Sequence, residues 1–199
     1  MLKVGIAGGI GSGKTVICQI FSTLGIPIYN ADSETKQLYF TNHQLQSKLI
    51  EAFGREFYLT PNDLNKSFVR SLLNEQKTRE LLNSIVHPVV FKHFENWVQL
   101  QTSPYVIKEA AILFESGADK TVDLVLGVIA DSEIRINRVV QRDSMLRESV
   151  QKIMDLQLSN EELISKCDFV IYNNGNESII EQVLKIHKEL LHQSTHFQG

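Results

Sequence analysis

The chain has 199 residues, 43% of them hydrophobic, and a formal net charge of −3 at pH 7. This size predicts one compact unit with room for an inserted subdomain, and the slightly negative charge gives no support for nucleic acid as the main partner. No apolar run approaches the roughly 20 residues of a membrane span, no signal peptide is recognisable, and two distant cysteines suggest no disulfide framework, so we expect a soluble cytoplasmic protein with no membrane partner.

The chain opens with a pattern of strand, glycine-rich loop, helix and strand. Residues 2–7, "LKVGIA", predict a buried strand, and residues 15–25 carry apolar side chains at helical spacing. Gly25 follows that helix as a typical C-terminal glycine. Residues 26–30, "IPIYN", predict a second strand. This order is typical of the βαβ unit of a parallel sheet.

The segment from residue 32 to 101 has a different character. Its apolar spacing predicts helices over residues 44–54, 67–74 and 78–100, and strand-like runs are absent. Pro88 predicts a boundary or kink within the last helix. We therefore expect a helical insertion after the second strand.

Strand and helix patterns alternate over the rest of the chain. Strands are predicted at residues 105–110, 122–130 and 168–173, and helices at 132–142, 147–157 and 177–191. Ser159 and Glu162 have the spacing of a capping box, and the polar tail 192–199 is expected to fray. The prediction is a doubly wound parallel α/β fold with a core of residues 1–31, 102–141 and 159–199, an insertion at 32–101 and a lid at 142–158.

The stretch "GGIGSGKT" has the Walker A spacing, formed by Gly8, Gly13, Lys14 and Thr15. Its glycines let backbone N–H groups form an anion-binding nest at a helix N-terminus, Lys14 adds a charge for the β and γ phosphates, and the Thr15 hydroxyl can ligate Mg²⁺. The loop therefore predicts a bound nucleoside triphosphate with Mg²⁺. The residues expected around the triphosphate are Gly8, Gly9, Ile10, Gly11, Ser12, Gly13, Lys14, Thr15 and Val16.

The loop alone does not identify the reaction. A guanine-reading N-K-x-D motif is missing, because Asn65-Lys66 continues with Ser-Phe, and "VIKEAA" offers only Glu109 where a motor ATPase has a strand ending in aspartate. A small-molecule kinase is the favoured class. Asp32 follows the second strand, where ligands gather in parallel sheets, and it can act as a base toward an acceptor hydroxyl or merely cap the next helix. Position alone does not separate these two roles.

Three arginines, Arg138, Arg142 and Arg147, flank the expected lid. Their planar guanidinium groups match phosphate oxygens, on which charge spreads during transfer. Each can instead form a surface salt bridge with a nearby acid such as Asp143 or Glu148. We favour a catalytic role for Arg142, leave Arg138 open and favour a salt bridge for Arg147.

Six motifs occur in an order that resembles the dephospho-CoA kinases. They are "GGIGSGKT", "NAD" at 30–32, "HP" at 87–88, "ILFE" at 112–115, "QRD" at 141–143 and "NNG" at 173–175. The resemblance implies a P-loop kinase core, a helical CoA-binding subdomain and a mobile lid. It also implies ATP-dependent phosphorylation of the ribose 3′-hydroxyl of dephospho-CoA, the last step of coenzyme A synthesis.

The resemblance also implies roles for single residues. Asp32 matches the second aspartate of the family's D-A-D and becomes the candidate base, whereas Asn30 replaces the first. Lys66 stands where arginine is usual, which keeps the charge and loses the bidentate geometry. The acceptor residues implied are Asp32, Lys66, Arg70 and His87, although the sequence alone favours His87 as a helix histidine with local hydrogen bonds. Arg138 and Asn174 are placed with the nucleotide, and Glu115 either stabilises its region or approaches Mg²⁺ through water.

Two other functions remain open from the sequence. A shikimate-kinase-like enzyme also combines a P-loop with an acid after the second strand, and a non-catalytic module would bind ATP without turnover. Release of ADP in the presence of dephospho-CoA, shikimate or no acceptor separates the three. The sequence does not indicate an oligomeric state.

Overall fold

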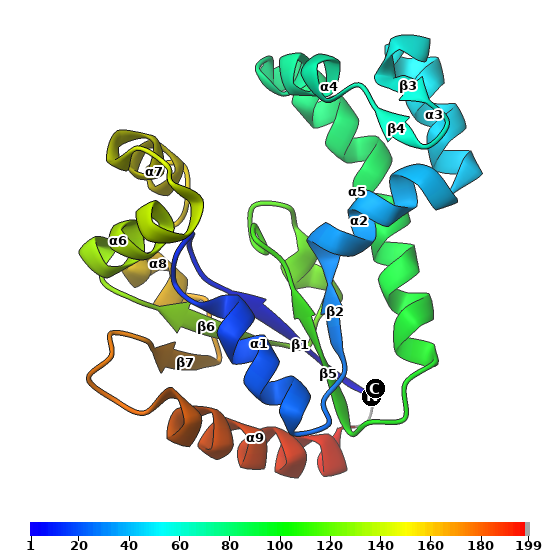
Figure 1. Cartoon of the computed structure of the whole chain (residues 1–199). Helices are drawn as coiled ribbons and strands as arrows, with labels where there is room; N and C mark the ends of the chain where they lie inside the picture. The colour runs from blue at the N-terminus through cyan, green and yellow to red at the C-terminus, as the bar shows by residue number, and fades with distance from the viewer. Residues whose placement is uncertain (198–199) are drawn as a thin grey trace. The chain divides into compact units, whose positions relative to one another are not determined.

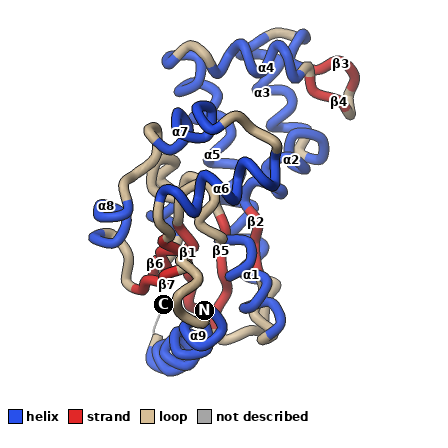
Figure 2. Tube along the Cα trace, turned by 60° about the vertical axis from the view of Figure 1, so that its left-hand side comes forward, coloured by secondary structure: helices blue, strands red, loops and turns tan. Residues whose placement is uncertain are grey.

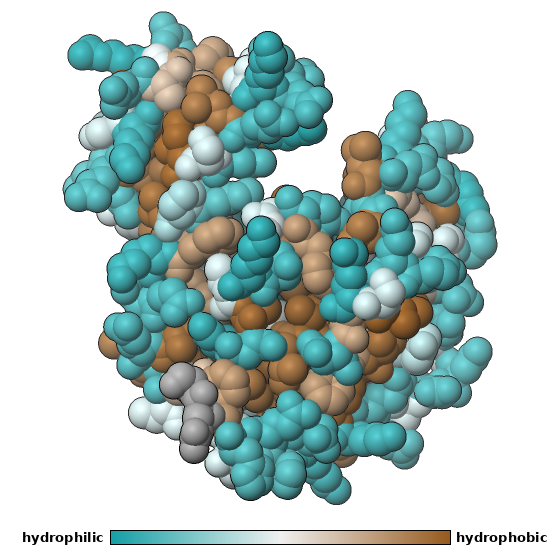
Figure 3. All heavy atoms as spheres, turned by 180° about the vertical axis from the view of Figure 1, so that it is seen from behind, coloured by the Kyte–Doolittle hydropathy of each residue, from teal (hydrophilic) through white to brown (hydrophobic). Residues whose placement is uncertain are grey.

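The computed structural model of the chain describes residues 1–197. Its contacts divide the chain into two compact units, one formed by Met1–Asn30 and Leu100–Gly199 and the other by Ala31–Gln99. Within the described residues, no helix is both long and apolar enough to cross a bilayer. The surface seen from behind is largely hydrophilic, with hydrophobic side chains interspersed (Figure 3).

The first unit is built on a five-stranded sheet in the order β2-β5-β1-β6-β7, and every neighbouring pair is parallel (Figure 1). This confirms the predicted doubly wound parallel fold. The strands are near-continuous apolar runs because both faces of a parallel sheet are covered, and all five residues of β5 are buried. The strands are β1 (Leu2–Ala7), β2 (Ile28–Asn30), β5 (Tyr105–Glu109), β6 (Leu124–Ile129) and β7 (Phe169–Tyr172).

Helices α1 (Lys14–Thr23) and α9 (Ile179–His196) pack together against the sheet. Their apolar faces bury Ile17 and Phe21 from α1 and Val183 from α9 in the main core. Gly25 has a φ of 81° and follows α1 as predicted. The expectation that residues 192–199 fray is wrong for residues 192–196, because α9 continues to His196. Residues 198 and 199 lie outside the described residues.

The remaining helices of this unit are α6 (Ser132–Asp143), α7 (Arg147–Met154), α8 (Asn160–Ser165) and the short 3₁₀ helix η2 (Ala118–Thr121). The capping box at α8 is confirmed, since Ser159 accepts from the Glu162 backbone and the Glu162 side chain accepts from the Ser159 backbone. Cys18 is buried in α1, and burial, followed by the nearby Glu109, raises the pKa of its thiol. Cys18 is therefore a protonated core residue.

The second unit is mainly helical, as expected, but the absence of strands is a wrong prediction. Tyr58 and Leu64 pair in a small antiparallel sheet (Figure 2), whose strands are too short to show an alternating pattern. Its elements are α2 (Ala31–Thr41), α3 (His43–Phe53), η1 (Arg55–Phe57), β3 (Tyr58–Thr60), β4 (Asp63–Leu64), α4 (Lys66–Leu73) and α5 (Gln76–Gln99).

Helix α5 continues through Pro88, so the proline does not end it. Leu82, Val86 and Val90 recur every four residues on both sides of the proline and belong to one hydrophobic core. Continuous burial of that face offsets the one backbone hydrogen bond that proline removes.

Candidate active site

The candidate site lies at the carboxyl ends of the central strands. Strand β1 runs between β5 and β6, and the chain leaves it directly into the glycine-rich loop. Ile6 of β1 pairs with Glu109 of β5, which also pairs with Asn30 of β2, so these three strands end at one level. The loop thus occupies the switch point of the sheet, where ligands bind in folds of this kind.

The loop presents the N-terminus of α1 without a side-chain cap. Gly13 precedes the helix with a φ of 100°, and Gly11 has a φ of 77°, conformations that favour glycine. The first N–H groups of a helix have no intrahelical acceptor. Uncapped, they form an anion site together with the positive end of the helix dipole.

Lys14 brings its charge back to this loop. Its Nζ donates to the carbonyl oxygen of Gly8 at 2.5 Å. The ammonium group is therefore positioned at the start of the loop, where a phosphate chain bound by the N–H groups would meet it. The geometry is that of a P-loop.

Glu109, at the end of β5, contacts Thr15 at the start of α1 and Asn30 at the end of β2. Its Oε1 accepts from Thr15 Oγ1 at 2.8 Å and its Oε2 accepts from Asn30 Nδ2 at 2.9 Å. A hydroxyl and a carboxylate are the hard oxygen donors that suit Mg²⁺, so these residues fit the ion. Asn30, in place of the family's aspartate, contributes an amide donor to Glu109 rather than a second negative charge.

Arg138 connects α6 to the loop after β7. Its Nη2 donates to the carbonyl oxygen of Asn173 at 2.9 Å, and the buried Asn173 amide donates to the carbonyl oxygen of Ser12 at 2.8 Å. These bonds leave Arg138 half-buried beside the phosphate loop, without a carboxylate partner in the described chain. Asn174 exchanges side-chain and backbone hydrogen bonds with Asp131.

The other two arginines form exposed ion pairs. Arg142 donates to both carboxylate oxygens of the adjacent Asp143, at 2.8 and 2.7 Å, and this hydrogen bonding lowers the pKa of Asp143. Arg147 pairs with Glu133, so it forms the salt bridge favoured from the sequence, though not with Asp143 or Glu148. A phosphate contact by Arg142 stays a prediction.

The predicted acceptor residues lie in the second unit. Asp32 is exposed in the first turn of α2, which already begins at Ala31, and its carboxylate makes no capping hydrogen bond in the described chain. Lys66 and Arg70 are exposed and one turn apart on α4. His87 is half-buried on α5, with its ring 5.9 Å from that of Phe91.

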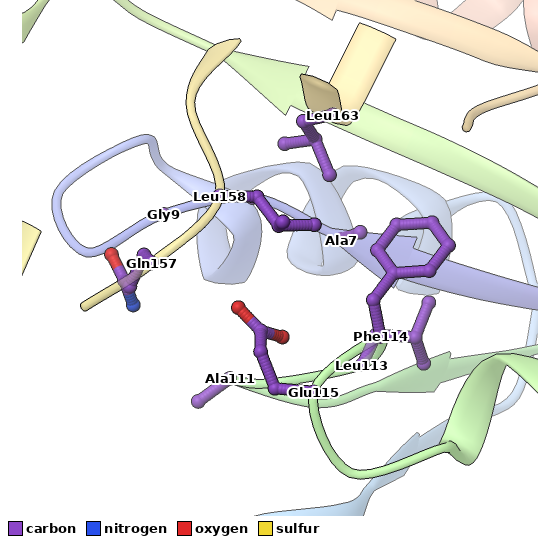
Figure 4. A pocket seen from close by; sticks show the side chains of 10 residues that line it. Ala7, Gly9, Ala111, Leu113, Phe114, Glu115, Gln157, Leu158 and Leu163 are labelled. Carbon is purple, nitrogen blue, oxygen red and sulfur yellow. The ribbon is translucent and has the colours of Figure 1, made fainter. Parts of the chain in front are cut away.

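A small pocket adjoins the phosphate loop in the first unit. Figure 4 shows the Glu115 carboxylate and the Gln157 amide facing the space beside Gly9. Gln157 is also hydrogen-bonded to the loop, because its Oε1 accepts from the Ile10 backbone at 2.9 Å. Apolar side chains complete the wall, among them Leu113, Phe114, Leu158 and Leu163.

Sequence reasoning did not select three residues of this region for the site: Glu109, Gln157 and Arg135, a buried residue of α6 that donates to the carbonyl oxygen of Ile10. Glu109 stands where a motor ATPase has an aspartate, and the pattern around Arg135 and Gln157 predicts only helices. Glu109 lies 94 residues from Thr15 in the chain, so only the strand order brings them together. The position of Glu109 at the end of a predicted buried strand is the one sequence feature that could have indicated its place in the site.

Comparison with known proteins agrees with this geometry. The family model described as dephospho-CoA kinase matches residues 2–178. A dephospho-CoA kinase of Bacteroides fragilis is 34% identical over 198 residues, covering 98% of this chain and 96% of the relative; one of Fusobacterium nucleatum is 35% identical over 185 residues, covering 92% and 95%. The solved structure of TT1252 from Thermus thermophilus matches with a TM-score of 0.82 at 25% identity, covering 94% of this chain and 96% of that one. The chain belongs to the dephospho-CoA kinase family.

Proposed function

We propose that this protein transfers the terminal phosphoryl group of ATP to the ribose 3′-hydroxyl of dephospho-CoA, forming coenzyme A and ADP. The observation that carries the proposal is the phosphate loop before α1, a helix with no side-chain cap, with the Lys14 ammonium group hydrogen-bonded to the Gly8 carbonyl oxygen. The chain that contains it matches the family over residues 2–178. Membership of this family favours dephospho-CoA over shikimate as acceptor, and a kinase over a non-catalytic ATP-binding module.

The phosphate loop holds and polarises the nucleotide. Backbone N–H groups of Gly11, Gly13, Lys14 and Thr15, at the α1 N-terminus, bind phosphate oxygens, whereas that of Ser12 donates to the carbonyl oxygen of Gly9 at 3.2 Å. Lys14 adds a full positive charge where negative charge builds up on the transferring group. Arg138, with hydrogen bonds to the loop that follows β7, binds the nucleotide from the α6 side.

Thr15 and Glu109 are the residues that would hold Mg²⁺. Mg²⁺ held by these residues would neutralise part of the negative charge of the triphosphate. The Thr15 hydroxyl donates to Glu109 Oε1 at 2.8 Å. Asn30 orients the same carboxylate through its Oε2, and the orientation of ligand groups by such neighbours tunes metal affinity.

Replacing Glu109 by glutamine is expected to raise the Mg²⁺ concentration needed for half-maximal rate by roughly 10- to 100-fold, the usual effect of changing a group that ligates or orients a ligand of a metal. The variant keeps the shape of the side chain and loses its charge. Rates are measured at fixed ATP over a Mg²⁺ series. Glu189→Gln, on α9 and hydrogen-bonded to Gln193, is the control, and an unchanged Mg²⁺ requirement in Glu109→Gln would exclude the carboxylate from the metal site.

We assign acceptor binding to the second unit. Lys66 and Arg70 present two positive side chains from adjacent turns of α4, an arrangement suited to the phosphate groups of dephospho-CoA. Asp32 orients the ribose hydroxyl and accepts its proton. His87 contributes from α5.

Arg142→Ala is expected to lower kcat more than it weakens ATP binding. We assign residues 142–158 to a lid whose closure exchanges the Arg142–Asp143 pair for oxygens of the transferring phosphoryl group, a contact that strengthens toward the transition state. Steady-state kcat and direct ATP binding are measured on the same preparation. Arg147→Ala, which breaks only the exposed pair with Glu133, should behave like the parent protein. A change confined to the KM for ATP would make Arg142 a plain binding residue.

The proposed function is tested by ADP release with dephospho-CoA, with shikimate and with no acceptor. We expect release that depends on dephospho-CoA, together with a product heavier by one phosphoryl group. Release that depends on shikimate would identify the other kinase. ATP binding without turnover in any arm would identify a non-catalytic module.

A further inference from the structure

Arg135 is a charged residue buried at the phosphate loop. Only 4% of its surface is exposed. Its Nε donates to the carbonyl oxygen of Ile10 at 2.9 Å, and its Nη2 donates to Gln157 Oε1 at 3.3 Å. Its guanidinium group also occupies the place of a side chain at residue 9, because a Cβ on Gly9 would lie 1.9 Å from Nη2. The absence of a side chain at Gly9 is what admits the arginine.

The Arg135 charge has no negative partner in the described chain. Both of its hydrogen-bond acceptors are neutral oxygens, and Glu115, which lines the adjoining pocket, forms no ion pair with it. A guanidinium group has five N–H donors, so donors remain. Burial lowers the pKa of Arg135. An unpaired buried charge is costly unless a bound ion compensates it.

The position of Arg135 indicates which anion compensates the charge. The Lys14 ammonium group lies at the carbonyl oxygen of Gly8, and the Arg135 guanidinium group lies against Gly9, the next residue. In a P-loop the lysine reaches the β and γ phosphates. Two cations therefore lie against consecutive residues at the start of the loop, Gly8 and Gly9.

We propose that Arg135 is a further nucleotide-binding residue, held in place by Ile10 and Gln157, whose counter-charge is the terminal phosphate of the bound triphosphate. This rests on the proposed function, since it requires a nucleoside triphosphate in the loop. The fork of the guanidinium group suits two oxygens of one phosphate. Arg135 thereby makes the site prefer ATP to ADP.

The test compares the affinities of Arg135→Gln for ATP and ADP, both with Mg²⁺, and measures the melting temperature of the free protein. Glutamine keeps an N–H donor for the Ile10 carbonyl and removes the charge. We expect roughly 10- to 100-fold weaker ATP binding, the scale of a hydrogen bond to a charged group, and a smaller loss for ADP. The melting temperature should stay equal or rise, because an uncompensated buried charge is gone. Arg147→Gln is the matched control and Arg135→Lys, which keeps charge but not the fork, should be intermediate.

A structural role for Arg135 gives the opposite pattern. If Arg135 only braces the loop through the contacts of its Nη2 group with Gln157 and Gly9, which glutamine loses, Arg135→Gln lowers the melting temperature or fails to fold, and ATP and ADP affinities fall equally or not at all. Each of these results overturns the inference. Transfer to dephospho-CoA by the wild-type protein is measured in parallel. If the wild type does not transfer but Arg135→Gln loses the preference for ATP over ADP, only the proposed acceptor is overturned. If the wild type transfers and Arg135→Gln keeps the preference, only this inference is overturned.

Discussion

Replacing Lys14 by alanine is expected to reduce phosphoryl transfer at least roughly 10³-fold, the upper range for losing one preorganised group that stabilises transition-state charge. The ammonium group lies at the Gly8 carbonyl oxygen, facing the loop and not the core. Helix α1 is held by Ile17 and Phe21, both fully buried, and these are unchanged. The variant should therefore fold normally and lose activity.

The measurements are kcat with dephospho-CoA and the melting temperature of the free protein. Lys185→Ala removes an exposed lysine of α9 and serves as the matched control for loss of one positive charge. Near-normal turnover by folded Lys14→Ala would show that this loop does not act in catalysis. Loss of folding would instead show that Lys14 is a structural residue of the loop.

The phosphate loop could be predicted because its information is local. The strand, the glycine spacing and the helix all lie between Leu2 and Thr23, and the structure places the start of α1 at Lys14, directly after the loop. The parallel sheet followed from the alternation of buried strands and helices. The pairing of Thr15 with Glu109 could not be predicted, because it depends on β5 lying beside β1.

Arg135 shows a second limit of sequence patterns. An arginine counts as polar in any helical periodicity, yet on α6 it shares the buried face with Ile136 and Val139. The space that it fills exists because residue 9 has no side chain, a complementarity between positions 126 residues apart. The hairpin of β3 and β4 was missed for a different reason, since strands of two or three residues carry no periodic signal.

The structure also narrows the two roles that the sequence left open for Asp32. A helix cap precedes the first helical residue and accepts a backbone N–H. Helix α2 begins at Ala31, so Asp32 is already inside its first turn and makes no capping hydrogen bond in the described residues. A carboxylate in that position can still favour the helix dipole. The remaining choice is between a weak helix contribution and the acceptor chemistry that we propose.

Asp32→Asn is expected to lower kcat by roughly 10²-fold or more, the scale that general-base catalysis commonly contributes. A ribose hydroxyl is a poor nucleophile at neutral pH, and a carboxylate can orient it and take its proton late in transfer. The transition state is loose, so much of the effect comes from positioning. Asparagine keeps the shape and removes the proton acceptor. ATP affinity should change little, because we assign Asp32 to the acceptor.

Glu34→Gln is the control, since Glu34 is the other acidic residue in the first turn of α2. It also weakens the contact of the Glu34 carboxylate with His93 Nδ1, at 3.9 Å. Both variants remove one negative charge from the same helix N-terminus. Each should therefore lose the favourable interaction with the helix dipole, which is about 0.3–1 kcal/mol of stability. Only Asp32→Asn should lose transfer. Steady-state kcat with dephospho-CoA, direct ATP binding and melting temperature are measured on both. Full kcat in Asp32→Asn, with a loss of stability no larger than in Glu34→Gln, would reduce Asp32 to a helix-terminus residue and leave the base unidentified.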